Sequence, residues 1–563
     1  MLCRSLLSVA ILLASLAMPG AVLAQTEEPA APAPVSAAPA GDSLLFYYLE
    51  SGPVTLAKVD DDAAPAIAAG HTYAADMDLV VWVEADPYSG RDIRAAFVYH
   101  HNGAMSGAPF AVAENTRNAS APAVAFDPVH ERFLVVWQEE ICTGTAPVTC
   151  ARAIRGRLVH SEYYNLPDPL AGDVVTIAAS PNNDLTSPAL ALNAENGIFL
   201  VAFLRSPAGA DPVAGDVYGQ MVRSDSTTPV VLGPPDGFAV LDHATDRAES
   251  VDAAWSDAAA GTFFVAAQMR DAADATYVEG AYLSDAYPDD GQPLLGAWRI
   301  APYALGDHPL TNDRFQPSVA YDAASAAYVL VFGYRVAAGA EMRILYGQRV
   351  RPTYDGATFR YDDSYAFPVA ATPYLDVFSY AAHRLVATGT EKDLAVFFLA
   401  RTEDDSGDGA ISSLISLNGT AASIGLGPFG ISYGWLHSPP QAACRNGACL
   451  AVWAEPLLQS HINDLLVQRV RPYCKTVEVE VLPFCPGCSV LQSPQNCYDG
   501  YKDNSVVTLA AVPGESCRLL EWSGDVNSNN LSVSLTMDKR KHVTATFVTG
   551  PAGPPTYLPM VRQ

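Results

Sequence analysis

The fold is decided by three short segments that recur along the chain, and residues 122–159 hold their clearest copy. The segments are Pro122-Ala-Val-Ala-Phe-Asp127, Phe133-Leu-Val-Val-Trp137 and Ile154-Arg-Gly-Arg-Leu-Val159. The same order returns at residues 188–222 and 317–350, where the third segment contains Tyr-Gly-Gln. Short apolar or alternating runs separated by polar turns are typical of β-strands. The chain therefore repeats a unit of at least three strands.

Seven copies of this unit lie between about residues 60 and 470, the weaker ones beginning near Pro65, Val251, Leu385 and Pro440. One position near the end of the second segment marks each copy. The seven marker residues are Trp82, Trp137, Phe203, Ala267, Phe332, Phe397 and Trp453, and consecutive markers are 55 to 66 residues apart. A period this long, with three or four strands per unit, predicts the blades of a β-propeller. We expect an all-β chain with a seven-bladed propeller of four-stranded blades.

The residue types suit this arrangement. The second segment is apolar throughout, as expected of a strand covered on both faces by neighbouring blades. The first segment has small residues at alternate positions, such as Ala123 and Ala125, and small side chains fit where inner strands crowd near an axis. A fourth, outer strand is predicted at residues 110–113, 174–177, 238–241 and 298–300.

The ends of the repeat predict how the ring closes. The seventh unit ends at Val470 without a fourth segment, whereas strand-like residues 44–49 and 54–59 precede the first unit. We expect one of these early segments to complete the last blade, which would remove a free sheet edge. The alternative is an open array or a stacked β-solenoid.

Residues 60–470 resemble the propeller-like repeats of secreted bacterial surface proteins. The resemblance rests on Pro-x-Val-Ala-Tyr-Asp, as at Pro317–Asp322, and on Gly-Gln-Arg-Val, as at Gly347–Val350. It implies an architecture and leaves the activity open. The WD40 Gly-His and Trp-Asp signature and the sialidase Ser-x-Asp-x-Gly-x-Thr-Trp box are missing.

A second domain follows the repeats. Strand-like residues 477–481, 506–510 and 543–547 flank Trp522-Ser-Gly-Asp525 and Met537-Asp538. This order is similar to the divergent InlB-type B-repeat, which implies a small β-grasp-like module that serves as stalk, spacer or contact surface. Trp522 is interpreted as a core aromatic followed by a turn, and the alternative is a residue that stacks on a ligand.

The first residues of the chain indicate export. Arg4, the apolar stretch from Leu6 to Ala17 and Val22-Leu-Ala24 form the pattern of a signal peptide. The expected organisation is therefore a signal peptide at 1–24, a Pro/Ala-rich linker at 25–42, the propeller at 43–472, the B-repeat-like domain at 473–549 and a Pro/Gly tail at 550–563. The apolar stretch is short for the alternative, a membrane anchor, and no later stretch is long enough to span a membrane.

The formal net charge of −28 narrows the classes of partner. A strongly acidic surface disfavours nucleic acid and anionic membranes. Cations, neutral glycans and basic proteins stay compatible with it. The simpler interpretation of the charge is solubility outside the cell.

Nine cysteines lie after residue 24, and in an exported chain we expect mainly disulfides with one cysteine left over. Cys444 and Cys449 flank Asn446-Gly447, a two-residue hairpin signal that places them opposite each other. Cys142 and Cys150 flank an inserted loop and are expected to bridge it. The remaining five are Cys474, Cys485, Cys488, Cys497 and Cys517, whose connectivity stays open. Cys485-Pro-Gly-Cys488 also has zinc-site spacing, with Cys474 and Cys497 as further ligands, but export favours disulfides.

One acidic segment is a candidate metal site. Asp404, Ser406 and Asp408 place oxygen atoms at alternate positions before a glycine, as in calcium-binding loops. The later acidic residue that completes such loops is missing, so the preferred interpretation is an acidic turn. Apart from the zinc alternative at Cys485 and Cys488, calcium is the only cofactor that the sequence suggests.

No catalytic motif is present: the chain lacks a Gly-x-Ser-x-Gly elbow, a His-Glu-x-x-His helix and a phosphate-binding glycine loop. The first hypothesis is therefore a non-catalytic, exported binding or adhesion protein that contacts an extracellular glycan or protein through a propeller face. The alternatives are a glycan-active hydrolase or lyase and a structural envelope component. Carboxylates and arginines gathered at one channel mouth would favour the enzyme, and a lining of alanine and serine would favour the binding protein or the scaffold.

Overall fold

A computed structural model gives the fold of the chain, and every regular element in the described residues is a β-strand. The described residues are 48–49, 53–59, 64–70, 77–86, 90–114, 116–143, 149–161, 169–209, 215–256, 262–284, 294–299, 314–322, 326–335, 343–354, 359–362, 366–370, 377–387, 393–402, 408–418, 421–430, 440–445, 448–456, 463–471, 475, 477–482, 487–493, 500–501, 505–514, 517–537 and 541–549. Within them, no helix has the length and hydropathy needed to cross a membrane.

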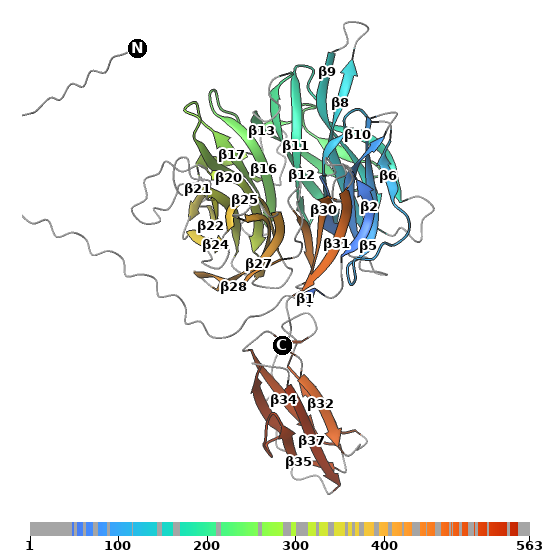
Figure 1. Ribbon diagram of the computed structural model, residues 1–563, viewed down its shortest axis with the longest axis vertical. Helices are drawn as coiled ribbons and strands as arrows, with labels where there is room; N and C mark the ends of the chain where they lie inside the picture. Colours follow the sequence, from blue (N-terminus) through green and yellow to red (C-terminus); the bar gives the residue numbers. More distant parts are fainter. Residues whose placement is uncertain are drawn as a thin grey trace, which may run out of the picture. The chain divides into compact units, whose positions relative to one another are not determined.

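The repeats fold into seven antiparallel sheets in which consecutive strands pair (Figure 1). The first four sheets consist of β3 (Ala66–Ala69), β4 (Met77–Asp86), β5 (Gly90–Tyr99) and β6 (Phe110–Ala113); β7 (Ser120–Asp127), β8 (Arg132–Thr143), β9 (Thr149–His160) and β10 (Leu170–Ala178); β11 (Asn183–Asn193), β12 (Ile198–Pro207), β13 (Asp216–Arg223), β14 (Val230–Leu232) and β15 (Phe238–Leu241); and β16 (Arg247–Ser256), β17 (Thr262–Arg270), β18 (Thr276–Ser284) and β19 (Leu294–Arg299).

The other three sheets follow the same order. They consist of β20 (Arg314–Asp322), β21 (Ala327–Arg335), β22 (Arg343–Tyr354), β23 (Phe359–Asp362) and β24 (Ala366–Ala370); β25 (Val377–Ala387), β26 (Asp393–Thr402), β27 (Asp408–Asn418) and β28 (Ala421–Gly430); and β29 (Gln441–Arg445), β30 (Ala448–Pro456) and β31 (Asn463–Arg471), joined by β1 (Tyr48–Leu49) and β2 (Val54–Val59).

The first strands of the sheets form a closed ring. Each contacts the first strand of the next sheet, and β29 of the seventh sheet contacts β3 of the first. Both early strands pair with β31, Leu49 opposite Val470 and Val54 opposite Val467. The chain therefore contains a seven-bladed β-propeller, and the predicted closure of the last blade by a segment from the start of the chain is confirmed.

The second strands form the core, as their sequence predicts. Trp82, Trp137 and Trp453 are at most 1% exposed. The indole Nε1 of Trp137 donates to Glu139 at 3.1 Å, and that of Trp453 donates to Glu455 at 3.2 Å. A glutamate two residues after the tryptophan thus satisfies a buried donor in two blades.

Polar side chains of the third strands link neighbouring blades, and a glycine of the third strand packs against the outer strand of its own blade. Arg157 donates through Nη1 to the carbonyl of Val112 at 2.9 Å, and Gln220 donates to the carbonyl of Ile177 at 3.4 Å. Each carbonyl belongs to the outer strand of the preceding blade. At Gly156, an added Cβ atom would lie 2.9 Å from Ile177 Cγ1, so the outer strand packs too closely for a larger residue.

The outer strands differ from the prediction in the third, fifth and seventh blades. There the fourth position is occupied by two short strands that pair with different parts of the third strand, as β14 and β15 do with β13. The register of β15 shifts between its pairs with Val217 and Tyr218. A strand at the edge tolerates such breaks because only one of its sides is paired.

The C-terminal module contains two three-stranded sheets. Its two sheets have the strand orders β32–β37–β35 and β33–β34–β36, and their bounds are β32 (Val477–Leu482), β33 (Ser489–Gln492), β34 (Val506–Val512), β35 (Cys517–Gly524), β36 (Ser532–Thr536) and β37 (Lys541–Thr549). The first and last strands pair in parallel, which suits the expected β-grasp-like character. Trp522 is 1% exposed within the core, and its Nε1 donates to the carbonyl of Asn530 at 2.7 Å, so the interpretation as a core aromatic is confirmed.

Candidate binding site at the channel mouth

The inner strands begin with an unusual backbone conformation at one end of the channel. Ala64, Ala121, Ser187 and Gln316 each precede the proline of their repeat and have φ values of 37° to 53°. A positive φ is uncommon for residues other than glycine, and a following proline restricts the preceding residue further. The pairing register shifts between Ser120 and Ala123 and at the matching places in the third and fifth blades, which is the mark of a β-bulge.

Two glutamines hold these bulges in place from the preceding blade. The Oε1 atom of Gln138 accepts a hydrogen bond from the Ser187 amide at 2.9 Å, and Oε1 of Gln268 accepts one from the Gln316 amide at 2.7 Å. Gln138 also donates to the Ser120 hydroxyl at 2.7 Å. An amide turned out of the ladder by the bulge thus finds its acceptor in the neighbouring blade.

A cavity of about 370 Å³ lies at this end of the channel. It is lined by residues 64–67, 121–124, 187–190, 249–252 and 316–318 and by Gln441. Proline, alanine, serine and aliphatic residues predominate in this lining, and the predicted small residues Ala123, Ala189 and Ser318 belong to it. We call this cavity the channel mouth.

The two carboxylates in the described lining are both held by neighbouring groups. Arg270 bonds both oxygens of Glu249, through Nη2 at 3.1 Å and through Nε, and this bonding raises the pKa of Arg270. Asp252 Oδ2 accepts from the Ser318 hydroxyl at 2.9 Å and from the Val319 amide at 3.0 Å. The mouth thus lacks a pair of unengaged carboxylates among its described residues.

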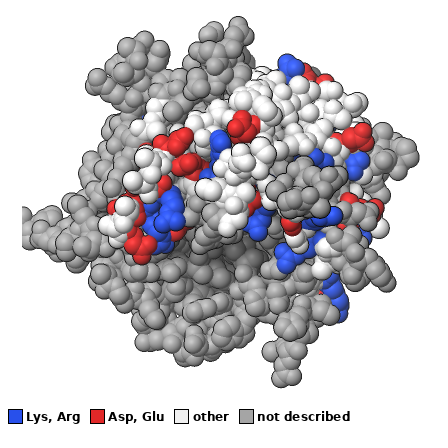
Figure 2. Space-filling model, turned by 90° about the horizontal axis from the view of Figure 1, so that it is seen from above, with Lys and Arg blue, Asp and Glu red and all other residues white. Residues whose placement is uncertain are grey.

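Charges around this end also occur in opposite-sign groups. Figure 2 looks onto the end at which the β8–β9 hairpin projects, and its acidic and basic side chains lie next to one another in small groups. Arg94, for example, lies 2.6 Å from Glu84 and 3.7 Å from Glu114. Pairing of this kind leaves little local field to select a charged ligand.

A second polar group lies between the third and fourth blades, outside the cavity lining. His243 Nε2 is 3.0 Å from Glu279 Oε2, and the His243 amide donates to Asp216 Oδ1 at 3.3 Å. Burial raises the pKa of Asp216, and the Arg205 guanidinium lies 4.4 Å from the centre of the Tyr218 ring. These side chains include a candidate acid and a candidate base.

One Ser-His-Asp group resembles a catalytic triad in composition only. His130 Nδ1 lies 2.6 Å from Asp127 Oδ2, and the Ser224 hydroxyl donates to the same oxygen. In a triad the serine bonds the other ring nitrogen, Nε2. Ser224 is fully buried, so this group stabilises the turn after β7.

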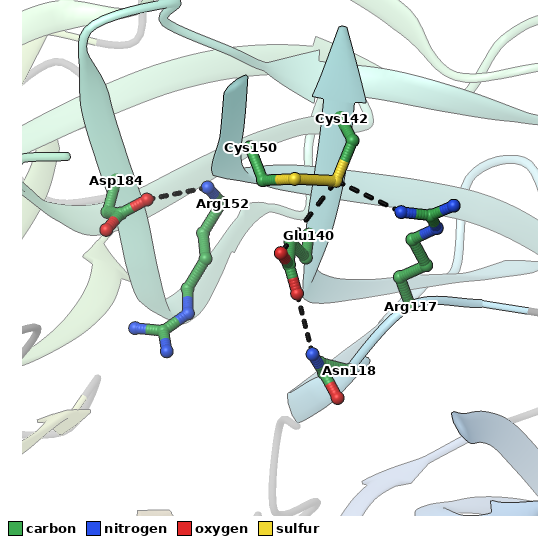
Figure 3. Close-up of a disulfide and its surroundings, with 7 residues drawn as sticks. All are labelled: Arg117, Asn118, Glu140, Cys142, Cys150, Arg152 and Asp184. Atoms are coloured by element: carbon green, nitrogen blue, oxygen red, sulfur yellow. Dashed lines mark hydrogen bonds between the residues drawn. A yellow bond between two sulfur atoms is a disulfide. The ribbon is translucent and has the colours of Figure 1, made fainter. Parts of the chain in front are cut away.

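Both predicted hairpin disulfides are present, Cys142–Cys150 and Cys444–Cys449. Figure 3 shows the first, where Arg117 Nη1 donates to Cys142 Sγ at 3.2 Å and Asn118 donates to Glu140 at 2.6 Å. On the other side of the hairpin, buried Asp184 accepts from the Arg152 amide at 2.7 Å. The hairpin is thus tied to both neighbouring segments.

The remaining predicted site residues are only partly covered. Cys517 is disulfide-bonded and Cys488 is a free thiol, whereas positions 474, 485 and 497 lie outside the described residues. Asp404 and Ser406 also lie outside them, and Asp408 begins β27. The calcium and zinc interpretations therefore stay predictions.

Sequence reasoning missed the residues that shape the mouth: Gln138, Gln268, Glu249, Arg270 and Asp252. The glutamines follow the marker position directly, but only in the second and fourth copies. Their absence from the other copies hid them, since the repeat was recognised by what its copies share.

Comparison with known protein families identifies the C-terminal module. Residues 493–551 match the family model of the divergent InlB B-repeat domain, so the resemblance of the C-terminal module is confirmed. No curated protein matches the chain.

Several solved structures are similar in fold. The Hadza microbial sialidase has a TM-score of 0.38 and 11% identity over 68% of this chain and 73% of its own. A polysaccharide lyase, an ulvan lyase, has a TM-score of 0.39 and 12% sequence identity, and the match covers 73% of this chain and 94% of the lyase. The β-propeller domain of the Trilobed protease from Pyrococcus furiosus has a TM-score of 0.36 and 10% sequence identity, and the match covers 72% of this chain and 93% of that domain. These distant likenesses carry no inference about what this chain binds.

Proposed function

We propose that the chain is an exported, non-catalytic binding protein that takes an extracellular ligand at the channel mouth. The observation that carries the proposal is the chemistry of the mouth. Its lining is small, apolar and hydroxyl-bearing, and its described carboxylates are bonded to Arg270, Ser318 and Val319. Such a site offers shape and a few polar contacts, which is the usual composition of a binding pocket.

The same chemistry favours an uncharged ligand. Glu249 is neutralised by Arg270, and Asp252 is 6% exposed and already accepts two hydrogen bonds. A charged ligand would have to displace these partners, whereas a neutral glycan or a neutral peptide segment would not. The predicted signal peptide and the disulfides support export.

Binding of purified cell-envelope polysaccharides to the full chain tests the proposal. Filling the mouth by Ala123→Trp or Ser250→Trp, from two blades of the ring, is expected to lower the affinity at least tenfold. Val129→Trp is the matched control, because Val129 is 50% exposed in the turn at the other end of the second blade. Unchanged binding by both filled variants, or release of altered sugar by the chain, would contradict the proposal.

A glycan-active enzyme is the second candidate, favoured by the raised pKa of Asp216 beside His243. Such an acid keeps its proton at a higher pH than an ordinary aspartate and is suited to donate it. This candidate predicts release of altered sugar that Asp216→Asn abolishes, while Ala123→Trp leaves the release measurable.

A further inference from the structure

One face of the C-terminal module carries no charged side chain among its described residues, and most of its side chains are exposed. It is the outer face of the sheet β33–β34–β36, where Leu491 lies opposite Ala510, Ala510 opposite Ser532 and Val506 opposite Thr536. Intervening residues such as Val507 and Leu509 are buried in the core. The side chains that alternate to the outside are those of Ser489, Leu491, Val506, Thr508, Ala510, Val512, Ser532, Ser534 and Thr536. We call this surface the neutral face.

The neutral face contains the two most exposed large hydrophobic side chains of the described residues. Val506 is 64% exposed and Leu491 is 62% exposed. Serine and threonine residues surround these two side chains. Every residue of the neutral face is exposed except Ala510 and Val512, which are partly exposed. Exposed apolar side chains that share one sheet face mark it as a candidate contact surface.

The other sheet of the module differs sharply in charge. On the outer face of β32–β37–β35, Glu478, Glu480 and Arg518 are exposed, as are Glu521 and His542. Leu482 is 44% exposed on this same face. The lack of charge is therefore a property of one sheet and not of the whole module.

The distribution of charge along the chain indicates which partner suits the neutral face. Residues 473–549 contain eight acidic and six basic residues, so nearly all of the net charge of −28 lies elsewhere in the chain. Two copies approaching through their propellers would repel each other, whereas contact through the neutral faces avoids close like charges. Serine and threonine hydroxyls both donate and accept, so the face is complementary to itself.

We propose that the neutral face is a self-association surface whose partner is the same face of a second copy of this chain. Two sheets can pack face to face about 10 Å apart, with Leu491 and Val506 buried between them. The contact is isologous, as in two-fold symmetric dimers. The proposal is independent of what the channel mouth binds.

The size of the face sets the expected strength. Three strands of about five residues cover roughly 250 Å². A standard stable interface buries about 800 Å² per partner. The dimer is therefore expected to be weak and to form only at high protein concentration.

Sedimentation velocity of the full chain at concentrations up to about 1 mM tests the proposal. The native chain is expected to shift from monomer towards dimer as concentration rises. Leu491→Lys and Val506→Lys are expected to stay monomeric, because dimerisation would bury an unpaired charge. Lysine lowers the net negative charge, so added repulsion between whole chains cannot cause that loss.

The matched control is Leu482→Lys, which places the same charge on the outer face of the other sheet. It is expected to associate as the native chain does. A native chain that stays monomeric at the highest concentration would overturn the proposal. So would equal loss of association by Leu482→Lys, or continued association of both neutral-face variants.

Discussion

Gln138 joins two blades through atoms that no strand ladder provides. Its Oε1 atom accepts from the amide of Ser187, which has a positive φ at a bulge and sits at the edge of the mouth. Its Nε2 group donates to Ser120 in its own blade. One amide side chain therefore satisfies a displaced backbone donor and fixes the distance between two inner strands.

Gln138→Leu is expected to lower the free energy of unfolding by about 1–3 kcal/mol, because it removes the acceptor from the Ser187 amide. Urea unfolding of the full chain measures the change. Gln138→Glu, which keeps an acceptor oxygen at this position, is the control and is expected to lose less. Equal stability of Gln138→Leu and the native chain would show that water replaces the glutamine.

At the residue scale, the sequence predicted the side chains that recur and missed those that do not. Trp137 and Trp453 were found because their neighbours repeat, and Trp522 because its turn follows the B-repeat pattern. Asp252 stands where four of the other six copies have alanine or serine, and its partners Ser318 and Val319 lie in the next blade. Partners of this kind depend on how blades pack, which spacing along one chain does not reveal.

The pairing of β8 with β9 includes more residue pairs than any other second-to-third-strand pairing in the described residues, and a disulfide closes this hairpin. Cys142 and Cys150 are directly opposed, with Cα atoms 4.0 Å apart. Asp184 of the next blade and Arg117 of the preceding connection hold its two sides. A hairpin held in this way loses little conformational entropy if its described residues contact a ligand.

Replacing both cysteines by serine is expected to destabilise the chain by about 2.5 kcal/mol, the chain-entropy value for a nine-residue loop. Hydrogen exchange is expected to rise at residues 139–143 and 149–153. The Cys444–Cys449 hairpin serves as the internal control, since its exchange should not change. Unaltered exchange at both hairpins would mean that strand pairing alone holds β8 and β9 together.

At the element scale, inner and second strands were predictable, and outer strands only in part. Inner and second strands must match neighbours on both sides, which fixes their small and apolar residues. An outer strand meets this demand on one side only. The break of one outer strand into β14 and β15 therefore left no clear pattern in the sequence.

At the scale of the whole molecule, the ring depends on its two ends meeting. Leu56 and Val59 of β2 pack in one cluster with Val80 and Val452, so the strand contributes to the core between the first and seventh blades. Without β2, residues 463–467 of β31 would be left unpaired and open to other chains. The sequence predicted this closure because the seventh copy visibly lacks its fourth segment.

Leu56→Asp tests whether this closure holds the propeller together. Leu56 is 5% exposed, and burying a carboxylate there is expected to cost at least about 3 kcal/mol, by detaching β2 or by lowering global stability. Urea unfolding and light scattering should show lower stability and concentration-dependent aggregation through β31. Thr55→Asp places the same charge on the exposed neighbour and is expected to behave as the native chain does. If both variants were equally stable and monomeric, the ring would hold without the early strand, and blade-to-blade contacts such as those of Gln138 would have to supply the closure.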